Sequence, residues 1–257
     1  MEMAKDRGQF WGLFMIDLRC GDCLELMKDI PDKSIDMILC DLPYGTTACK
    51  WDVVIPFEKL WTQYNRIIKD NGAIVLFGSE PFSSKLRMSN LKMYRYDWVW
   101  KKTIASNFAL SKKQPQKKHE NIIVFFKKQP TYNPQTEKGT PYIDKRCNGT
   151  RNVVVGTENI FKRKPIKNEG FRYPSTIQEF SNGNNNNVHP TQKPVELLEY
   201  LIKTYTNENE TVLDNCMGSG SAGVACINTN RNFIGIELDE KYFNIAKERI
   251  EKISLEG

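Results

Sequence analysis

The sequence alternates between short apolar runs and segments whose apolar residues recur at helical spacing. Strand-like runs cover residues 16–20, 34–40, 73–77, 96–100, 121–126, 211–214 and 233–237. Helix-like segments lie between or after them, at 23–30, 57–69, 194 onward, 222–228 and 240–253. Because strands that alternate with helices are joined into parallel sheets by helical crossovers, the sequence predicts an α/β fold with a mostly parallel, doubly wound sheet and helices on both faces.

Composition limits the class of protein. The chain has 257 residues, 40% of them hydrophobic and 26% charged, which is typical of a globular domain with an insertion. No apolar run approaches the roughly 20 residues that cross a bilayer, and residues 10–14 are too short for a signal peptide, so we expect a cytoplasmic protein with no membrane partner. Seven cysteines, an odd number, argue against a disulfide framework. Cys20 and Cys23 have zinc-ligand spacing, but no second pair exists and the chain has only two histidines, so we expect no metal site.

Periodicity divides the chain into four parts. Residues 1–14 show no clear period and are expected to form a loosely held N-terminal extension. Residues 15–128 and 188–257 carry the alternating pattern, and residues 129–187 are rich in Pro, Asn, Gly, Lys and Arg. We expect the latter to form an inserted, irregular module. A lysine-rich loop is predicted at 101–118, which is long for a compact domain and therefore typical of a functional segment.

Charge is distributed unevenly along the chain. Residues 101–175 hold seventeen basic and five acidic residues, whereas the whole chain has a net charge of only +6. Basic side chains that neutralise phosphates release condensed counterions, so a basic lobe on an acidic body favours contact with a polyanion. A solvated lysine-rich surface would have the same composition, and charge alone does not separate the two interpretations.

The segment from Asp41 to Gly45 follows a buried strand and is stopped by Pro and Gly. Asp41 and Tyr44 should therefore lie at the carboxyl end of that strand, where open α/β sheets bind their ligands. A carboxylate accepts N–H bonds and an aromatic ring stacks, so the pair suits a flat heterocycle with an amino group. An ordinary strand-to-loop turn with a satisfied Asp explains these five residues equally well.

A second constellation lies near the C-terminus. Residues from Asp214 to Ser221 join a strand to a helix and include Gly218 and Gly220, and Glu237 ends the next strand. Glycines allow close approach to a ligand, and an acid at this spacing accepts bonds from ribose hydroxyls, so the pattern predicts an adenosine-containing cofactor. Gly223 also has the spacing of a dinucleotide site, but no pattern for a hydride-transfer pocket accompanies it.

Together these motifs resemble one family. Asp41-Leu42-Pro43-Tyr44 is similar to the Asp-Pro-Pro-Tyr motif of S-adenosylmethionine-dependent DNA amino-methyltransferases, and the segment from His189 to Pro194 to the motif before their cofactor strand. The order of catalytic motif, recognition region and cofactor loop is that of the circularly permuted beta class. The resemblance covers most of 15–128 and 188–253. Leu42 replaces a proline, and residues 215–217 replace Asp-Pro-Phe, which bears on packing around the methionine moiety.

The resemblance implies a circularly permuted Rossmann-like methyltransferase fold with one antiparallel strand and an inserted recognition module at 129–187. It implies methylation of the N6 amino group of adenine in double-stranded DNA, with base flipping and S-adenosylmethionine as cofactor. Asp41, Leu42, Pro43 and Tyr44 would be catalytic. Cofactor contacts are expected from Asp22, Thr191, Lys193, Asp214, Gly218, Gly220 and Glu237. A cognate restriction endonuclease is a possible partner, and the chain would act as a monomer or homodimer.

Basic residues of the charged region are the expected contacts to nucleic acid. They are Lys101, Lys102, Lys112, Lys113, Lys117, Lys118, Arg146, Arg151, Lys162, Arg163 and Lys164. Two alternatives stay open: N4-cytosine methylation, which Asp41 disfavours because this family uses Ser there for cytosine, and a catalytically silent nucleic-acid-binding regulator on the same fold. A regulator would not need the intact motif around Asp41 and the glycine loop.

Overall fold

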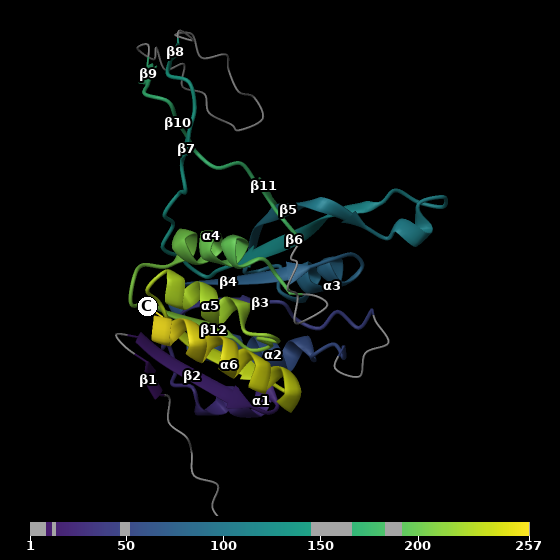
Figure 1. Ribbon diagram of the computed structural model, residues 1–257, viewed down its shortest axis with the longest axis vertical. Coiled ribbons are helices and arrows are strands. Elements are labelled where there is room, and N and C mark those ends of the chain that lie inside the picture. The colour runs from purple at the N-terminus through teal and green to yellow at the C-terminus, as the bar shows by residue number, and fades with distance from the viewer. Residues whose placement is uncertain (1–8, 12–13, 47–51, 145–165, 183–191, 257) are drawn as a thin grey trace, which may run out of the picture. The chain divides into compact units, whose positions relative to one another are not determined.

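The computed structural model describes residues 9–11, 14–46, 52–144, 166–182 and 192–256. Contacts divide the chain into two compact units, one formed by residues 1–133 with 176–257 and the other by residues 134–175. The larger unit contains the sheet and all the helices that the figures label (Figure 1). The two units are described separately below.

The larger unit is built on a nine-stranded sheet. Its strand order is β1-β2-β13-β12-β3-β4-β6-β5-β11. The bounds are β1 Gln9–Trp11, β2 Phe14–Cys20, β13 Asn232–Glu237, β12 Thr211–Asp214, β3 Ile35–Cys40, β4 Ile68–Gly78, β6 Lys117–Phe125, β5 Tyr94–Ser106 and β11 Ile177–Phe180. Strands from β2 to β4 pair in parallel, so the mostly parallel sheet is confirmed.

Two strands run against the others, whereas one was expected. β6 pairs antiparallel with both β4 and β5, and β1 pairs antiparallel with β2. The interpretation of residues 1–14 as a loose extension was therefore wrong for residues 9–11. Their short sequence carries no period of its own, and they become a strand because the edge of β2 offers backbone partners.

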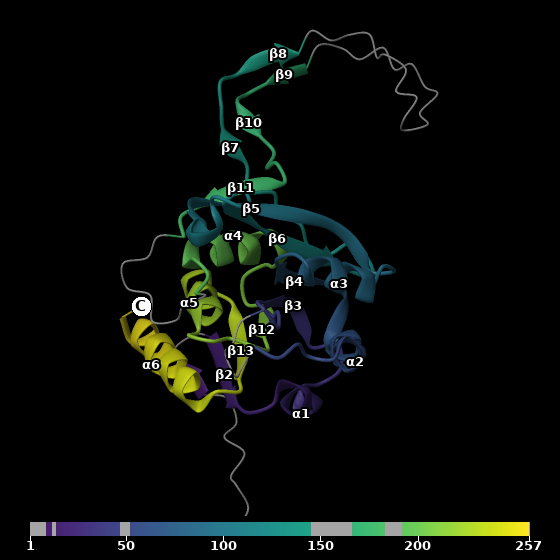
Figure 2. The same ribbon diagram turned by 90° about the vertical axis from the view of Figure 1, so that its right-hand side faces the viewer.

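Helices cover both faces of the sheet (Figure 2). One face carries α4 (Val195–Tyr205), α5 (Ser221–Asn228) and α6 (Glu240–Glu256), and the other α1 (Cys23–Leu26), the 3-10 turn η1 (Met27–Asp29), α2 (Phe57–Ile67) and α3 (Phe82–Ser89). Among the residues described, no helix combines the length and apolarity needed to cross a membrane.

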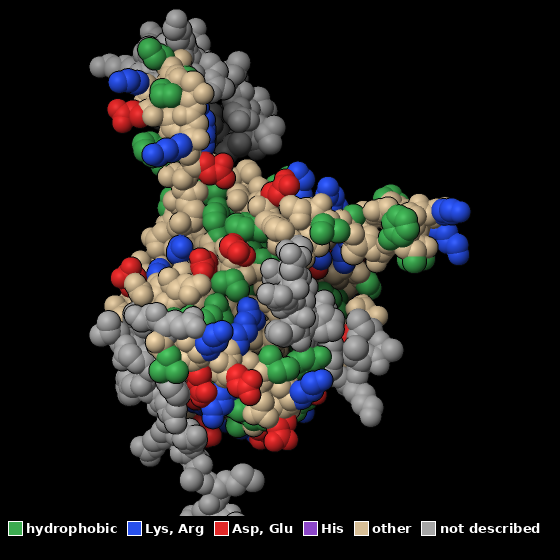
Figure 3. All heavy atoms as spheres, in the orientation of Figure 1, with side chains coloured by type: hydrophobic (Ala, Val, Ile, Leu, Met, Phe, Trp, Pro, Cys, Tyr) green, Lys and Arg blue, Asp and Glu red, His purple; other side chains and the backbone are tan. Residues whose placement is uncertain are grey.

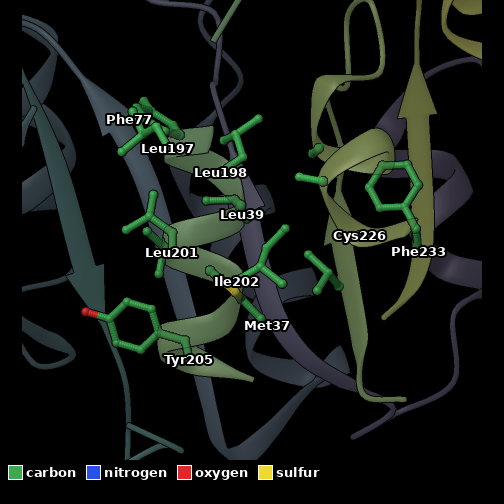
Figure 4. Packing of buried hydrophobic residues seen from close by; sticks show 14 of the residues in the cluster. Met37, Leu39, Phe77, Leu197, Leu198, Leu201, Ile202, Tyr205, Cys226 and Phe233 are labelled. Carbon is green, nitrogen blue, oxygen red and sulfur yellow. The ribbon is translucent and has the colours of Figure 1, made fainter. Parts of the chain in front are cut away.

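Strand alternation assigns the core residues of β3 to the two faces. Met37 and Leu39 pack in the cluster of α4 and α5, whereas Ile38 and Cys40 pack in the cluster of α1 and α2. Figure 4 shows the apolar side chains of α4 lying against Phe77, Leu39 and Met37. Each fully buried side chain of this size contributes about 1.5–3 kcal/mol.

Two segments differ from their predicted structure. β4 begins at Ile68, directly after α2, and therefore includes residues 68 and 69, which were predicted to be helical. Strands β5 and β6 extend into the predicted lysine-rich loop, pairing Lys101 with His119 and Ser106 with Lys117. Only residues 107–116 connect them, with a 3-10 turn η2 at Phe108–Leu110. The segment is therefore a two-stranded ribbon, because antiparallel pairing satisfies backbone groups whatever the side chains are.

In the smaller unit, the residues that the structure describes form two short antiparallel strand pairs. β7 (Glu137–Lys138) pairs with β10 (Phe171–Arg172), and β8 (Tyr142–Asp144) pairs with β9 (Ile166–Asn168). The guanidinium of Arg172 lies 4.7 Å from the centroid of the Tyr142 ring and donates to the Thr140 carbonyl at 2.6 Å. This unit lies within the segment expected to be an irregular module, but β11, from the same segment, belongs to the main sheet.

Candidate active site

A cavity of about 530 Å³ lies at the carboxyl ends of the central parallel strands. Its lining includes Gly21 after β2, Asp41 after β3, Asp214 at the end of β12 and Glu237 at the end of β13. Parallel strands place their carboxyl ends on one edge, which is why segments far apart in the sequence meet there. The volume falls within the range of small-molecule and cofactor pockets.

The segment after β3 forms one wall of the cavity. The Tyr44 hydroxyl donates to Asp41 Oδ1 at 2.7 Å, and the Tyr44 ring stacks on Phe82 of α3 with centroids 4.8 Å apart and an interplanar angle of 25°. Burial, and then the charge of Asp41, raise the pKa of Tyr44, so the hydroxyl stays protonated and is the donor of this bond. Leu42 and Pro43 line the same cavity, and the Leu42 side chain is buried.

Lys193 reaches the other oxygen of the same carboxylate. Its ammonium bonds to Asp41 Oδ2, lies 3.4 Å from Glu120 Oε2 and sits 5.1 Å from the centroid of the Phe77 ring. Burial acts to lower the pKa of Lys193, but the two carboxylates outweigh it and raise that pKa. The resemblance implied a cofactor contact for Lys193, whereas in this structure its charge is engaged by Asp41.

Glu120 is a cavity residue that the sequence reasoning missed. It lies on β6, and its buried carboxylate accepts from Lys102 through Oε1. Burial acts to raise its pKa, but Lys193 and Lys102 reverse the effect and lower it, so the carboxyl group is ionised. One signal could have identified it, because Glu120 is the only acid between Lys101 and Lys128 and directly precedes a buried run.

The predicted nucleic-acid contacts fall into four groups. Lys102 and Lys117 point inward: Lys102 pairs with Glu120 and lies 4.8 Å from the Trp100 ring centroid, and Lys117 bonds to the Ser79 hydroxyl. Lys101 is exposed and pairs with Glu179. Lys112, Lys113 and Lys118 are exposed on the ribbon of β5 and β6, and basic side chains gather beside apolar ones at its free end (Figure 3). Arg146, Arg151, Lys162, Arg163 and Lys164 lie outside the described residues.

The glycine loop after β12 is held by the acid at the end of β13. Glu237 Oε2 accepts from the Gly218 backbone N–H at 2.8 Å, and Oε1 accepts from the Asp239 N–H at 2.9 Å. Gly220 has a φ of +77°, and a Cβ there would lie 2.9 Å from the Ala246 Cβ of α6. Glycine is therefore required at 220 both for the backbone conformation and for the close approach of α6.

The residues that depart from the family pattern pack into the wall of the cavity. The Tyr64 hydroxyl of α2 donates to Asn215 Oδ1 at 2.5 Å in a buried bond. Met217 is buried against Gly235, where a Cβ would lie 2.4 Å from the Met217 sulfur.

Asp22 caps α1 by accepting from the Leu24 N–H at 2.7 Å and also lines the cavity. Thr191 lies outside the described residues.

Asp214 predicts a pH dependence of stability. Burial is the main cause that raises the pKa of its carboxyl group to about 7, well above the ordinary value for Asp. Between about pH 4 and pH 7 the folded chain holds a proton on Asp214 that the unfolded chain releases. The stability that this proton contributes is therefore fully present below about pH 4 and is lost as the pH rises through about 7. Asp214→Asn should raise the free energy of unfolding at pH 8 by on the order of 3 kcal/mol and leave it unchanged near pH 4.

Urea titrations of both proteins at pH 4, 6 and 8 would measure that dependence. Asn retains an acceptor for the Cys216 N–H, which bonds to Asp214 Oδ1 at 3.1 Å, so the substitution removes the charge and little else. Equal stabilities of the two proteins at pH 8 would contradict the raised pKa.

Comparison with known proteins identifies the family. A family model described as DNA methylase matches residues 35–248, most of the chain. The chain therefore belongs to the DNA methylase family. It is 28% identical over 250 residues to type II methyltransferase M.HpaI of Haemophilus parainfluenzae, covering 91% of this chain and 74% of that protein. It is 27% identical over 254 residues to DNA adenine methyltransferase YhdJ of Escherichia coli, covering 91% and 82%.

Solved structures share the fold. The crystal structure of the M1.HpyAVI-SAM complex matches with a TM-score of 0.61 and 24% identity, covering 91% of this chain and 100% of that one. PvuII DNA methyltransferase, described as cytosine-N4-specific, matches with a TM-score of 0.65 and 15% identity, covering 93% and 91%. The predicted α/β methyltransferase fold and family resemblance are thus confirmed.

Proposed function

We propose that this chain transfers a methyl group from S-adenosylmethionine to the N6 amino group of adenine in double-stranded DNA. The observation that best supports the proposal is that Asp41 and Tyr44 share one cavity with Glu237 and the glycine loop. A base-binding motif and a ribose-binding motif therefore face a common space. The name of one relative, DNA adenine methyltransferase YhdJ, supports adenine as the base.

The residues present fit the cofactor. Two acids, Asp22 and Glu237, line the cavity together with Gly218, whose backbone N–H bonds to Glu237. Carboxylates accept hydrogen bonds from the hydroxyl and amino groups of an adenosine, so this lining suits the cofactor. We assign the cofactor to Asp22, Asp214, Gly218, Gly220 and Glu237. Bound there, S-adenosylmethionine would supply an electrophilic methyl group on a sulfonium.

Asp41 and Tyr44 would prepare the base. The lone pair of an adenine amino group is delocalised into the ring, so the nitrogen is a poor nucleophile. Accepting its N–H bonds at Asp41 and at the Leu42 carbonyl favours a pyramidal nitrogen whose lone pair is available. The base has to leave the duplex stack, at a cost of a few kcal/mol, and Tyr44 provides an aromatic surface for it. Holding the two reactants together supplies a large part of the acceleration.

Methylation of DNA in cells that express the chain tests the proposal. Genomic DNA is digested to nucleosides and analysed by mass spectrometry, and long-read sequencing then locates the modified base. N6-methyladenine at a defined sequence supports the proposal. N4-methylcytosine in place of N6-methyladenine would show that the methylated base is cytosine. Absence of both, together with no binding of S-adenosylmethionine to the purified protein, would favour a silent DNA-binding regulator.

The free end of the ribbon of β5 and β6 is the part of the described surface that we assign to the DNA backbone. Lys112 and Lys113 are exposed there, and the segment from 101 to 118 contains no acid. Lys112→Ala with Lys113→Ala should weaken DNA binding and make the slope of log K against log[salt] less negative by about 2, because each phosphate contact contributes about −0.9 to that slope. Fluorescence anisotropy of a labelled duplex, at salt concentrations from about 50 to about 200 mM, measures both the affinity and the salt slope.

A matched control separates this effect from general loss of charge. Lys247→Ala with Lys252→Ala on α6 removes the same charge from the far end of the fold and should leave the salt slope unchanged. An unchanged slope in the ribbon variant would contradict the assignment.

We further propose that residues 129–187 read the DNA sequence. We also propose that the chain acts in the cytoplasm as a monomer or homodimer, with a restriction endonuclease as a candidate partner.

A further inference from the structure

Both oxygens of the Asp41 carboxylate already have partners within the chain. Tyr44 donates to Oδ1 at 2.7 Å, and the buried ammonium of Lys193 bonds to Oδ2. A carboxylate neutralised by an ammonium is a weak acceptor for an amino group, and the positive charge opposes the charge that develops on the attacking nitrogen. Under the proposed function, Lys193 has to move away from Asp41 before methyl transfer.

Glu120 provides a second acceptor for the same ammonium. Its Oε2 lies 3.4 Å from Lys193 Nζ, is buried, and has no hydrogen-bond partner among the described residues. Its other oxygen is held by Lys102, which lies over the Trp100 ring. A buried carboxylate oxygen without a hydrogen bond is costly, so Glu120, which already pairs with the ammonium at 3.4 Å, would gain stability by accepting a hydrogen bond from it.

We propose that Glu120 is a positioning residue that takes the ammonium of Lys193 from Asp41 when the target base enters, which frees Asp41 to accept the amino group. No proton is transferred, because Lys193 stays an ammonium and only its hydrogen-bond partner changes. Two carboxylates and two lysines keep the cluster neutral in both arrangements. This inference rests on the proposed function, and it gives Glu120 a role that the family resemblance does not assign.

Glu120→Gln tests the exchange. Gln keeps the shape of the side chain but lacks the negative charge, so Lys193 stays on Asp41. The turnover number at saturating DNA and S-adenosylmethionine should fall by at least about tenfold, which corresponds to about 1.4 kcal/mol of transition-state free energy. The Kd for S-adenosylmethionine, measured by calorimetry, should stay within about twofold, because the ion-pair partners of Glu120 are Lys102 and Lys193 and not residues of the glycine loop. Glu251→Gln, which removes an acid 3.9 Å from Lys247 on α6, is the matched control and should turn over normally.

A double substitution distinguishes positioning from a merely structural role. If Glu120 acts by removing Lys193 from Asp41, Glu120 is no longer needed once Lys193 is replaced by Met. The double variant, Glu120→Gln with Lys193→Met, should then turn over no more slowly than Glu120→Gln alone. Two independent losses that multiply would overturn the proposal, as would full turnover of Glu120→Gln. Should Glu120→Gln alone fail to fold, the turnover of the double variant is compared with that of Lys193→Met. A double variant more than about twofold slower than Lys193→Met would overturn the proposal.

Failure of the proposed function is distinguishable from failure of this inference. A wild-type protein that methylates no DNA removes the premise before any variant is made. A wild-type protein that methylates DNA, together with a Glu120→Gln variant of unchanged turnover, leaves the proposed function intact and rejects only the exchange.

Discussion

Asp41→Ala is expected to reduce the turnover number at least about a hundredfold, since the loss of an acceptor aimed at developing charge has effects of this size. The affinity for S-adenosylmethionine should stay within a few-fold, because the partners of Asp41 are Tyr44 and Lys193 and not the glycine loop. Single-turnover methylation of a duplex and calorimetric titration of the cofactor measure the two quantities separately.

The control for Asp41 is an acid of the same type that pairs with lysines far from the cavity. Asp70 lies 3.0 Å from Lys33 and 3.3 Å from Lys128 and is exposed, so Asp70→Ala should leave turnover unchanged. Asp41→Asn adds a second comparison, because it keeps the shape and can still accept from Tyr44 while losing the charge. If Asp41→Ala retained more than about a tenth of the wild-type turnover, Asp41 would not be the acceptor of the amino group.

Glu237→Ala is expected to weaken S-adenosylmethionine binding by roughly one to two orders of magnitude. The carboxylate makes charged hydrogen bonds to the backbone of Gly218 and Asp239, each of a kind that contributes about 1.5–3 kcal/mol, and we assign the ribose hydroxyls to the same group. Its loss removes a cofactor contact and the anchor of the loop together. Because burial raises the pKa of Glu237, binding should also weaken on acidification, as the carboxyl group becomes protonated.

Calorimetric titration with S-adenosylmethionine and with the demethylated product measures the effect of Glu237→Ala. Glu240→Ala, an exposed acid at the start of α6, is the neighbouring control and should bind normally. A selective loss of turnover with wild-type affinity would show that Glu237 serves the chemical step and not cofactor binding.

The placement of Asp41, Asp214 and Glu237 could be predicted from the sequence. Each follows or ends an apolar run with a clear strand period, and parallel strands bring such ends to one edge. The alternation of strands and helices therefore determined both the α/β architecture and the edge on which the cavity lies. Local periodicity contains this information because the burial of a strand or of one helix face is repeated at a fixed spacing along the chain.

Only the tertiary structure decided which basic residues are free. Lys102 and Lys112 look alike in the sequence, yet Lys102 is held by Glu120 from the neighbouring strand and Lys112 is exposed on the ribbon. The same holds for Lys193, whose partner Asp41 lies 152 positions away in the chain. The physical reason is that a long charged side chain has no period that reveals its environment. Whether such a side chain is ion-paired or exposed depends on which carboxylates the sheet topology places near it. That topology is determined by strand pairing between segments that are distant in the sequence.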